Sequence, residues 1–352
     1  MKIVDMHCDT LSEIWARRRK GKEVHLRENS LQLDLNRMKK RGYLLQNFAL
    51  FVDLGGCEDP WECVLDQYAL YCRELEANRD RIAPVFAYED VEANEAAGRM
   101  SAMLTVEEGA VCGGESAKLQ RLYEMGVRML TLTWNYPNEL GHPNLNARRA
   151  EQLQVSGEDP KEFLFTPDTE KGLTDRGREF VEEMERLGMI VDVSHLSDRG
   201  FYDVLACTQK PFVASHSNAR GVGRCVRNLT DHMIRSLGER GGCMGLNYCV
   251  DFLMADASQP MGSARDKEDV VRDIMDAAVC HARHISNVGG VDVLGLGSDF
   301  DGIEVNEALP GVQSIGKLWD ALHKAGFTSG ELDKIFAENV LRVYRDILKT
   351  GG

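Results

Sequence analysis

Short apolar runs alternate with longer amphipathic stretches along most of the 352-residue chain. Helical patterns lie between most of these runs, with Thr174 and Ser197 as expected helix starts and Gly188 as an expected helix end. Repeated strand and helix units give parallel strands joined by right-handed crossovers. Eight such units predict an α/β fold, a single (β/α)8 TIM-type barrel. The eight predicted strands are residues 3–8, 45–52, 102–107, 128–133, 189–194, 212–216, 243–248 and 293–299.

The strand count leaves two alternatives open. Residues 84–88 could form a ninth strand, and an open doubly wound sheet also fits the alternation. No Pro/Ser-rich linker, low-complexity tract or fixed-period repeat divides residues 1–352, so we expect one domain. A polar segment at about residues 136–172 is too long for an ordinary connection, and such segments often serve as lids or binding loops.

Composition and charge narrow the possible functions. The formal net charge of -14 argues against a general attraction to nucleic acids or anionic lipid surfaces. No apolar run approaches membrane-spanning length, and polar residues interrupt the N-terminal stretch where a signal peptide would be apolar. We therefore expect a cytoplasmic protein. Its ten scattered cysteines include no C-x-x-C pair, which predicts reduced thiols.

Side chains that bind metals or protons follow five of the predicted strands. Each alone would be an ordinary strand-end polar residue. In a barrel of this kind, however, the C-terminal ends of all strands open onto one mouth, where active sites are built. We therefore expect a metal site at that mouth, and three imidazoles with carboxylates suit Zn²⁺ or a similar ion. The residues are His7, Asp9, Glu107 or Glu108, His195, His216 and Asp299.

This set offers more ligands than one zinc ion needs. A carboxylate can bridge two ions, which together activate water and polarise a substrate oxygen, so a binuclear hydrolase site is predicted. Other signatures are weaker. The Gly295-x-Gly297 run lacks the third glycine of a dinucleotide fingerprint. Cys280-His281-x-x-His284 has the spacing of a small helical metal site but is expected to lie on the outer face of a helix.

Eight sequence stretches together resemble the membrane (renal) dipeptidase family of zinc peptidases. The resemblance covers nearly the whole chain, and the order and spacing of the stretches make it specific. They are DMHCD at 5–9, TVEEG at 105–109, GVRMLTLTWN at 126–135, VDVSH at 191–195, SHSNAR at 215–220, RNLTD at 227–231, GSDFDG at 297–302 and ENVLRV at 338–343.

The resemblance implies a (β/α)8 barrel with two zinc ions per chain. It places His7, Asp9 and Glu107 on one ion; Glu107 bridges to the second ion, which His195 and His216 complete. Glu108 is the adjacent alternative for the bridge. The family also implies that Arg227 binds the substrate carboxylate and that Asp299 transfers protons while a hydroxide held between the metals attacks the peptide carbonyl. A homodimer is what the family suggests.

The sequence departs from the family pattern at Trp134. The mammalian members carry a histidine there that helps to hold the substrate, whereas a tryptophan offers one N–H donor and no acceptor. We therefore expect Trp134 to contact substrate and to alter substrate preference. The expected function is zinc-dependent hydrolysis of free dipeptides, with L,D-dipeptides among the candidates. The alternatives are an amidohydrolase-type metal hydrolase acting on a non-dipeptide amide, lactone or phosphoester, and a metal-binding protein that has lost catalysis.

Overall fold

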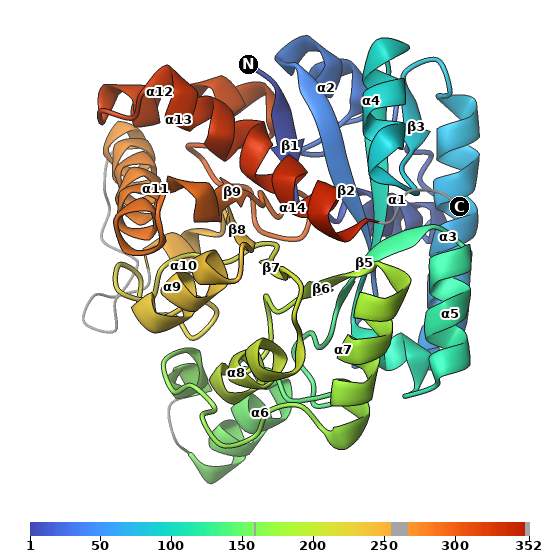
Figure 1. Ribbon diagram of the computed structural model, residues 1–352, viewed down its shortest axis with the longest axis vertical. Helices are drawn as coiled ribbons and strands as arrows, with labels where there is room; N and C mark the ends of the chain where they lie inside the picture. The colour runs from blue at the N-terminus through green and yellow to red at the C-terminus, as the bar shows by residue number, and fades with distance from the viewer. Residues whose placement is uncertain (158–159, 255–266, 349–352) are drawn as a thin grey trace.

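Eight parallel strands close into a barrel in the computed structural model, which describes residues 1–157, 160–254 and 267–348 (Figure 1). Each strand pairs in parallel with the next one around the ring, and β1 pairs with both β2 and β9 to close it. This confirms the predicted (β/α)8 barrel and excludes the open sheet. The strands are β1 (Ile3–Asp5), β2 (Tyr43–Phe51), β4 (Met100–Glu107), β5 (Val127–Thr131), β6 (Ile190–Asp192), β7 (Val213–Ala214), β8 (Cys243–Leu246) and β9 (Leu294–Leu296).

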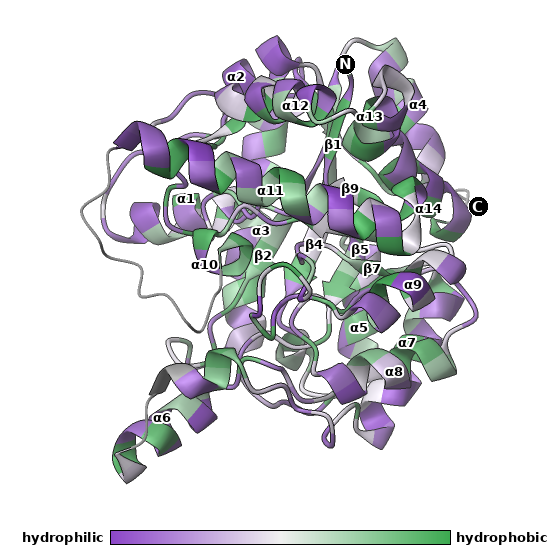
Figure 2. Cartoon of the chain, turned by 90° about the vertical axis from the view of Figure 1, so that its left-hand side faces the viewer, coloured by the Kyte–Doolittle hydropathy of each residue, from purple (hydrophilic) through white to green (hydrophobic). Residues whose placement is uncertain are grey.

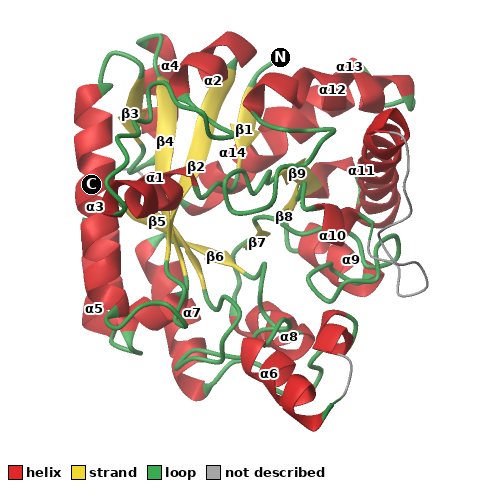
Figure 3. Ribbon diagram, turned by 180° about the vertical axis from the view of Figure 1, so that it is seen from behind, coloured by secondary structure: helices red, strands yellow, loops and turns green. Residues whose placement is uncertain are grey.

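A ninth strand lies outside this ring. Strand β3 (Ile82–Pro84) pairs only with the first residues of β4, so it lies beside the N-terminal end of that strand (Figure 3). It begins two residues before the segment 84–88 that the sequence suggested as an extra strand. The chain leaves the strand after Pro84 because a helix begins soon afterwards at Tyr88.

Helices surround the barrel, and the predicted helix signals are confirmed. Thr174 caps one helix by accepting a hydrogen bond from the Gly177 N–H (2.9 Å), and Ser197 caps the next from Gly200 (3.0 Å). Gly188 ends the first of these helices with φ 81°. The helices are α1 (Thr10–Arg19), α2 (Leu35–Arg41), α3 (Pro60–Ala77), α4 (Tyr88–Ala96), α5 (Ser116–Glu124), α6 (Ala147–Ser156), α7 (Asp175–Leu187), α8 (Asp198–Cys207), α9 (Asp231–Glu239), α10 (Val250–Leu253), α11 (Lys267–Gly289), α12 (Ile315–Lys324), α13 (Ser329–Asp333) and α14 (Asn339–Ile347).

Two apolar clusters form the core. The larger one packs the outer sides of the strands against the surrounding helices. The second packs strand residues such as Val4, Met103 and Ile190 against Val340 and Tyr344 of α14. Strands β6, β7 and β8 contribute their first residues to this cluster, and α14 crosses the N-terminal end of the barrel there (Figure 1). The opposite, C-terminal mouth is therefore the end left for a site.

The polar segment at 136–172 is a helical arm with anchored ends. Helix α6 contributes no buried residue and extends away from the body of the molecule (Figure 2). Leu145 before it and Leu164 after it line the cavity at the barrel mouth. Residues 158–159 lie outside the described part. None of the described helices has the length and apolar character that crossing a membrane requires.

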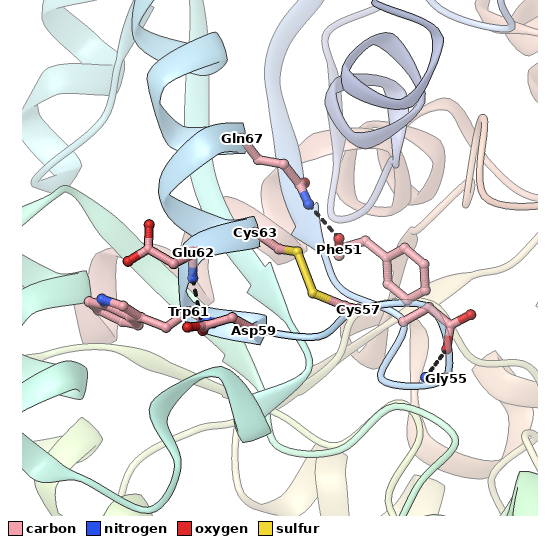
Figure 4. The surroundings of a disulfide bond; sticks show 9 residues. Phe51, Gly55, Cys57, Asp59, Trp61, Glu62, Cys63 and Gln67 are labelled. Carbon is pink, nitrogen blue, oxygen red and sulfur yellow. Dashed lines mark hydrogen bonds between the residues drawn. A yellow bond between two sulfur atoms is a disulfide. The ribbon is translucent and has the colours of Figure 1, made fainter. Parts of the chain in front are cut away.

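The expectation of ten reduced thiols is wrong for one pair. Cys57 and Cys63 form a disulfide, whereas the other eight cysteines are free (Figure 4). The bond joins the β2–α3 loop to the first turn of α3. Asp59 starts that helix by accepting hydrogen bonds from the N–H groups of Trp61 and Glu62, which turns the chain back on itself. This local turn brings the two cysteines together, and sequence spacing alone did not predict it.

Candidate metal centre

The five predicted ligands and the predicted proton-transfer residue, Asp299, converge at the C-terminal mouth of the barrel. Strand β1 leads into two of them, β4 ends in a third, and β6, β7 and β9 lead into the others. All six side chains are buried, with at most 7% of each residue exposed. The barrel thus brings together His7, Asp9, Glu107, His195, His216 and Asp299 from five strands.

Glu107 lies between two groups of histidines. Its Oε2 is 3.2 Å from Nε2 of His7, and its Oε1 is 3.0 Å from Nε2 of His195 and 3.6 Å from Nε2 of His216. On the other side, Nε2 of His7 lies 3.3 Å from Oδ2 of Asp9. One carboxylate therefore faces both halves of the cluster, which is the geometry that a bridging ligand needs.

The donor set fits divalent metal ions. The Nε2 atoms of His195 and His216 lie 3.0 Å apart, although each ring uses its Nδ1 for a hydrogen bond elsewhere. Two imidazole lone pairs at that distance are compatible when a cation is shared between them. Oδ1 of Asp9 is buried and has no hydrogen-bond partner among the described residues. Imidazoles combined with carboxylates suit zinc and similar transition ions.

Burial and neighbouring charges set the protonation of the cluster. Burial, with smaller contributions from nearby positive groups, holds the pKa of His195 and of His216 well below the ordinary value. Burial also raises the pKa of Glu107 to about 7 and that of Asp299 to about 6. Burial acts to lower the pKa of His7, but the carboxylates of Glu107 and Asp9 outweigh it and hold that pKa well above the ordinary value. His195 and His216 are therefore neutral and able to bind metal.

Glu108 points away from this cluster. Its carboxylate accepts hydrogen bonds from the Ala110 N–H (2.8 Å), the Asn138 amide (2.5 Å) and the Trp134 N–H (3.2 Å). Its φ of 108° turns the backbone directly after Glu107. Of the two neighbouring glutamates, only Glu107 is placed among the histidines.

The three predicted residues outside the ligand set also line the cavity of about 980 Å³ that opens at this mouth. Oδ2 of Asp299 accepts a hydrogen bond from the Asn247 amide at 2.9 Å, and its Oδ1 lies 3.7 Å from Nε2 of His7. The Arg227 guanidinium is buried and donates to the carbonyl oxygens of Ser194 and His216.

Trp134 forms an aromatic wall beside the metal cluster. Its ring centroid lies 6.3 Å from that of His195 and 4.8 Å from that of Phe51, the latter in an edge-to-face arrangement. The two aromatic rings and the metal cluster therefore face the same cavity.

Comparison with known proteins decides the family. Residues 1–351 match the model of membrane dipeptidase, peptidase family M19. The chain belongs to this family. A protein of Klebsiella pneumoniae, uncharacterized and located in the pqqA 5′ region, is 30% identical over 289 residues, covering 82% of this chain and 97% of that protein.

Two solved structures share the whole fold. A dipeptidase described as a family M19 metallo peptidase has 26% identity and a TM-score of 0.84, covering 99% of both chains. A metallo peptidase from Rhodobacter sphaeroides, liganded with a phosphinate mimic of the dipeptide L-Ala-D-Ala, has 25% identity and a TM-score of 0.84, again covering 99% of both chains. The membership makes this chain a metallo-dipeptidase.

Several polar residues that support this cluster were not predicted from the sequence. Asp5 and Asp192 each end a strand with the same tripeptide, Ile-Val-Asp, and each lies just before a predicted ligand. That repeat was the available signal. Asn135 and Ser215 hold the Nδ1 atoms of His195 and His216, and their only signal was adjacency to cluster residues.

The outer-face prediction for the Cys280-His281-x-x-His284 run is wrong for His281. Its side chain is buried: Nδ1 accepts from the Ala219 N–H (3.1 Å), and Nε2 lies 3.0 Å from the Leu253 carbonyl oxygen. Both ring nitrogens are used by backbone groups, so this histidine joins α11 to the loop at Ala219 and to the end of α10 and offers no free ligand atom.

Proposed function

We propose that this metallo-dipeptidase is a binuclear zinc enzyme that hydrolyses free dipeptides, L,D-dipeptides among them. The observation that carries the proposal is the position of Glu107, which faces His7 on one side and His195 and His216 on the other inside a single cavity. The L-Ala-D-Ala mimic bound by the Rhodobacter sphaeroides relative supports the inclusion of L,D-dipeptides.

His7, Asp9 and Glu107 would hold one zinc ion, and Glu107, His195 and His216 the other. When bound, the two ions would polarise the peptide carbonyl and lower the pKa of the attacking water. Holding the ions in a buried cluster also excludes competing solvent, which strengthens the electrostatic contribution.

Asp299 is proposed to move the proton. Its carboxylate lies beside the cluster, and burial raises its pKa to about 6, near the range in which a group exchanges protons efficiently at neutral pH. The Asn247 amide fixes one of its oxygens at 2.9 Å, which leaves the other directed toward His7. Asp299 would take the proton of the attacking water and give it to the leaving amine.

Arg227 and Trp134 are proposed to hold the substrate. A dipeptide with a free carboxylate needs a cationic anchor, and the guanidinium of Arg227 lines the cavity. Trp134 presents an aromatic face and a single indole N–H, so it favours apolar contact over the polar contacts that a histidine would make.

The anchor role is tested by removing either the carboxylate of the substrate or the guanidinium of Arg227. Because Arg227 is buried and structurally bonded, the first comparison uses the unmodified protein with L-Ala-D-Ala and its C-terminal amide. A charged hydrogen bond contributes about 1.5–3 kcal/mol, so we expect kcat/KM to fall roughly 10- to 100-fold for the amide. Arg227→Ala should cause a similar loss, whereas Arg224→Ala, which changes an exposed neighbour, should not.

The same assay separates the proposed function from its alternative. Zinc-loaded protein that turns over no L,L or L,D dipeptide but hydrolyses a lactone or phosphoester would favour the amidohydrolase-type reading. Equal rates on the acid and the amide would remove the anchor role from Arg227.

A further inference from the structure

Resting on the proposed zinc site, we propose that Asp192 and Ser215 form a relay that orients the His216 ring and sets zinc affinity in the half of the centre made by Glu107, His195 and His216. Both are positioning residues, since neither faces the cavity. Both are fully buried.

The Asp192 carboxylate accepts hydrogen bonds from residues on or directly after three neighbouring strands. At the end of β6, its carboxylate accepts hydrogen bonds from Thr131 Oγ1 of β5 (2.6 Å), from the N–H and hydroxyl of Ser194 (3.1 and 2.6 Å), and from the N–H and hydroxyl of Ser215 after β7 (2.8 and 2.6 Å). A carboxylate with five donors has no freedom to move. It therefore gives Ser215 a fixed acceptor.

The direction of the Ser215 hydroxyl follows from its partners. A hydroxyl has one hydrogen, and for Ser215 the charged Asp192 Oδ2 at 2.6 Å is a stronger acceptor than Ser194 Oγ at 3.1 Å, whose own hydrogen goes to Asp192 Oδ1. Ser215 must then accept from Nδ1 of His216, which lies 2.8 Å away. With the hydrogen on Nδ1, the lone pair of His216 is on Nε2, the atom that faces Glu107 at 3.6 Å. The relay thus selects the tautomer that binds metal.

The other histidines lack such a link. Nδ1 of His195 lies 3.0 Å from the Asn135 amide oxygen, a neutral and half-buried partner. Asp5 occupies the matching strand end on β1 and its Oδ1 accepts from the backbone N–H groups of His7 (3.2 Å) and Ser298 (3.0 Å), but Nδ1 of His7 has no hydrogen-bond partner among the described residues. Only His216 is tied through a hydroxyl to a buried carboxylate among the described members of the cluster.

The test is zinc affinity of the metal-free protein, measured by competition with a chromophoric chelator. Loss of a partner behind a histidine ligand typically weakens metal binding, so Ser215→Ala should lower the affinity of one zinc ion roughly 10- to 100-fold and leave the other unchanged. Ser215→Thr, which keeps the hydroxyl, should restore it. Thr131→Val is the matched control, because it removes a 2.6 Å bond to the same Asp192 oxygen without touching His216.

Two results would overturn the relay: unchanged zinc affinities in Ser215→Ala, or equal weakening in Ser215→Ala and Thr131→Val. If Ser215→Ala does not fold, Asp192→Asn decides, since unchanged affinity there also removes the relay. The readout is independent of turnover. Protein that binds zinc as predicted but cleaves no dipeptide would contradict the proposed function and leave the relay standing.

Discussion

Two adjacent glutamates at the end of β4 have different surroundings. Glu107 faces the histidines, whereas Glu108 is satisfied by donors from its own loop and from the loop after β5. The positive φ of Glu108 is uncommon for a residue with a side chain, and it is held in place by those three hydrogen bonds. Glu108 thus supports the backbone at Trp134 while Glu107 stays with the cluster.

Replacing each glutamate with glutamine should separate the two roles. Glu107→Gln is expected to bind less zinc and to lose at least roughly 100-fold in kcat/KM, because the bridging charge is gone. Glu108→Gln should keep both zinc ions but unfold more easily, by about 1–3 kcal/mol, because its amide cannot accept all three hydrogen bonds. Elemental analysis and urea unfolding check both. Metal loss in Glu108→Gln alone would transfer the bridge to that residue.

Among single residues, the metal ligands could be predicted from the sequence, but the residues that hydrogen-bond those ligands could not. His7, His195 and His216 stand out because imidazoles at three strand ends are rare in combination. Asn135 and Ser215 are common residues in loops, and their importance depends on which way a histidine ring faces. That direction is set by packing across strands, which periodicity does not encode.

At the scale of the elements, the predicted strands often run past the observed ends. Residues 189–194 were predicted where β6 covers Ile190–Asp192, and 212–216 where β7 covers Val213–Ala214. The pattern continues because the chain after each strand turns into the barrel mouth and stays buried, as at Ser194 and His216. Because the strand and the site residues after it are both buried, the sequence pattern does not show where the strand ends.

Through His281, helix α11 makes the free energy of unfolding depend on pH. Burial lowers the pKa of this histidine to about 4, against an ordinary 6.5. Above pH 6.5 both folded and unfolded chains keep it neutral. Between 6.5 and 4 the unfolded chain binds the proton first, so stability falls as the pH falls, by up to about 3 kcal/mol.

Urea unfolding of the zinc-free protein at several pH values checks this. The difference in unfolding free energy between the original protein and His281→Gln should shrink toward pH 4. His323→Gln, at an exposed position, gives the baseline for losing a histidine. A difference that stays constant from pH 7 to 4 would contradict the assignment.

For the whole molecule, the proposed metal centre predicts a stability that depends on bound ions. Three carboxylates and three histidines are buried together, and binding of metal to the folded state alone stabilises it. At free zinc about 1,000-fold above the Kd this amounts to about 4 kcal/mol per site. Chelation should therefore lower the Tm by on the order of 5 °C or more, and added zinc should restore it.

Calorimetry with and without chelator measures this shift. His195→Ala is the control, since its Tm should respond less to chelator. An unchanged Tm in protein that has lost all its metal would contradict a stabilising role for the centre.

The barrel and the family were predictable because strand periodicity and motif order extend over the whole chain. The Cys57–Cys63 bond and the projecting α6 were not, because each depends on the path of one loop. The cytoplasmic location and the homodimer stay predictions.

Barrel closure has a consequence for how the enzyme is made. Strand β1 pairs with β2 on one side and with β9 on the other, so β1 cannot complete its pairing until β9 has also been synthesised. His7 and Asp299 therefore meet only after β9 has been synthesised, and a shorter nascent chain has no complete centre to fill. Zinc uptake by the complete centre should therefore follow barrel closure and report that it has taken place.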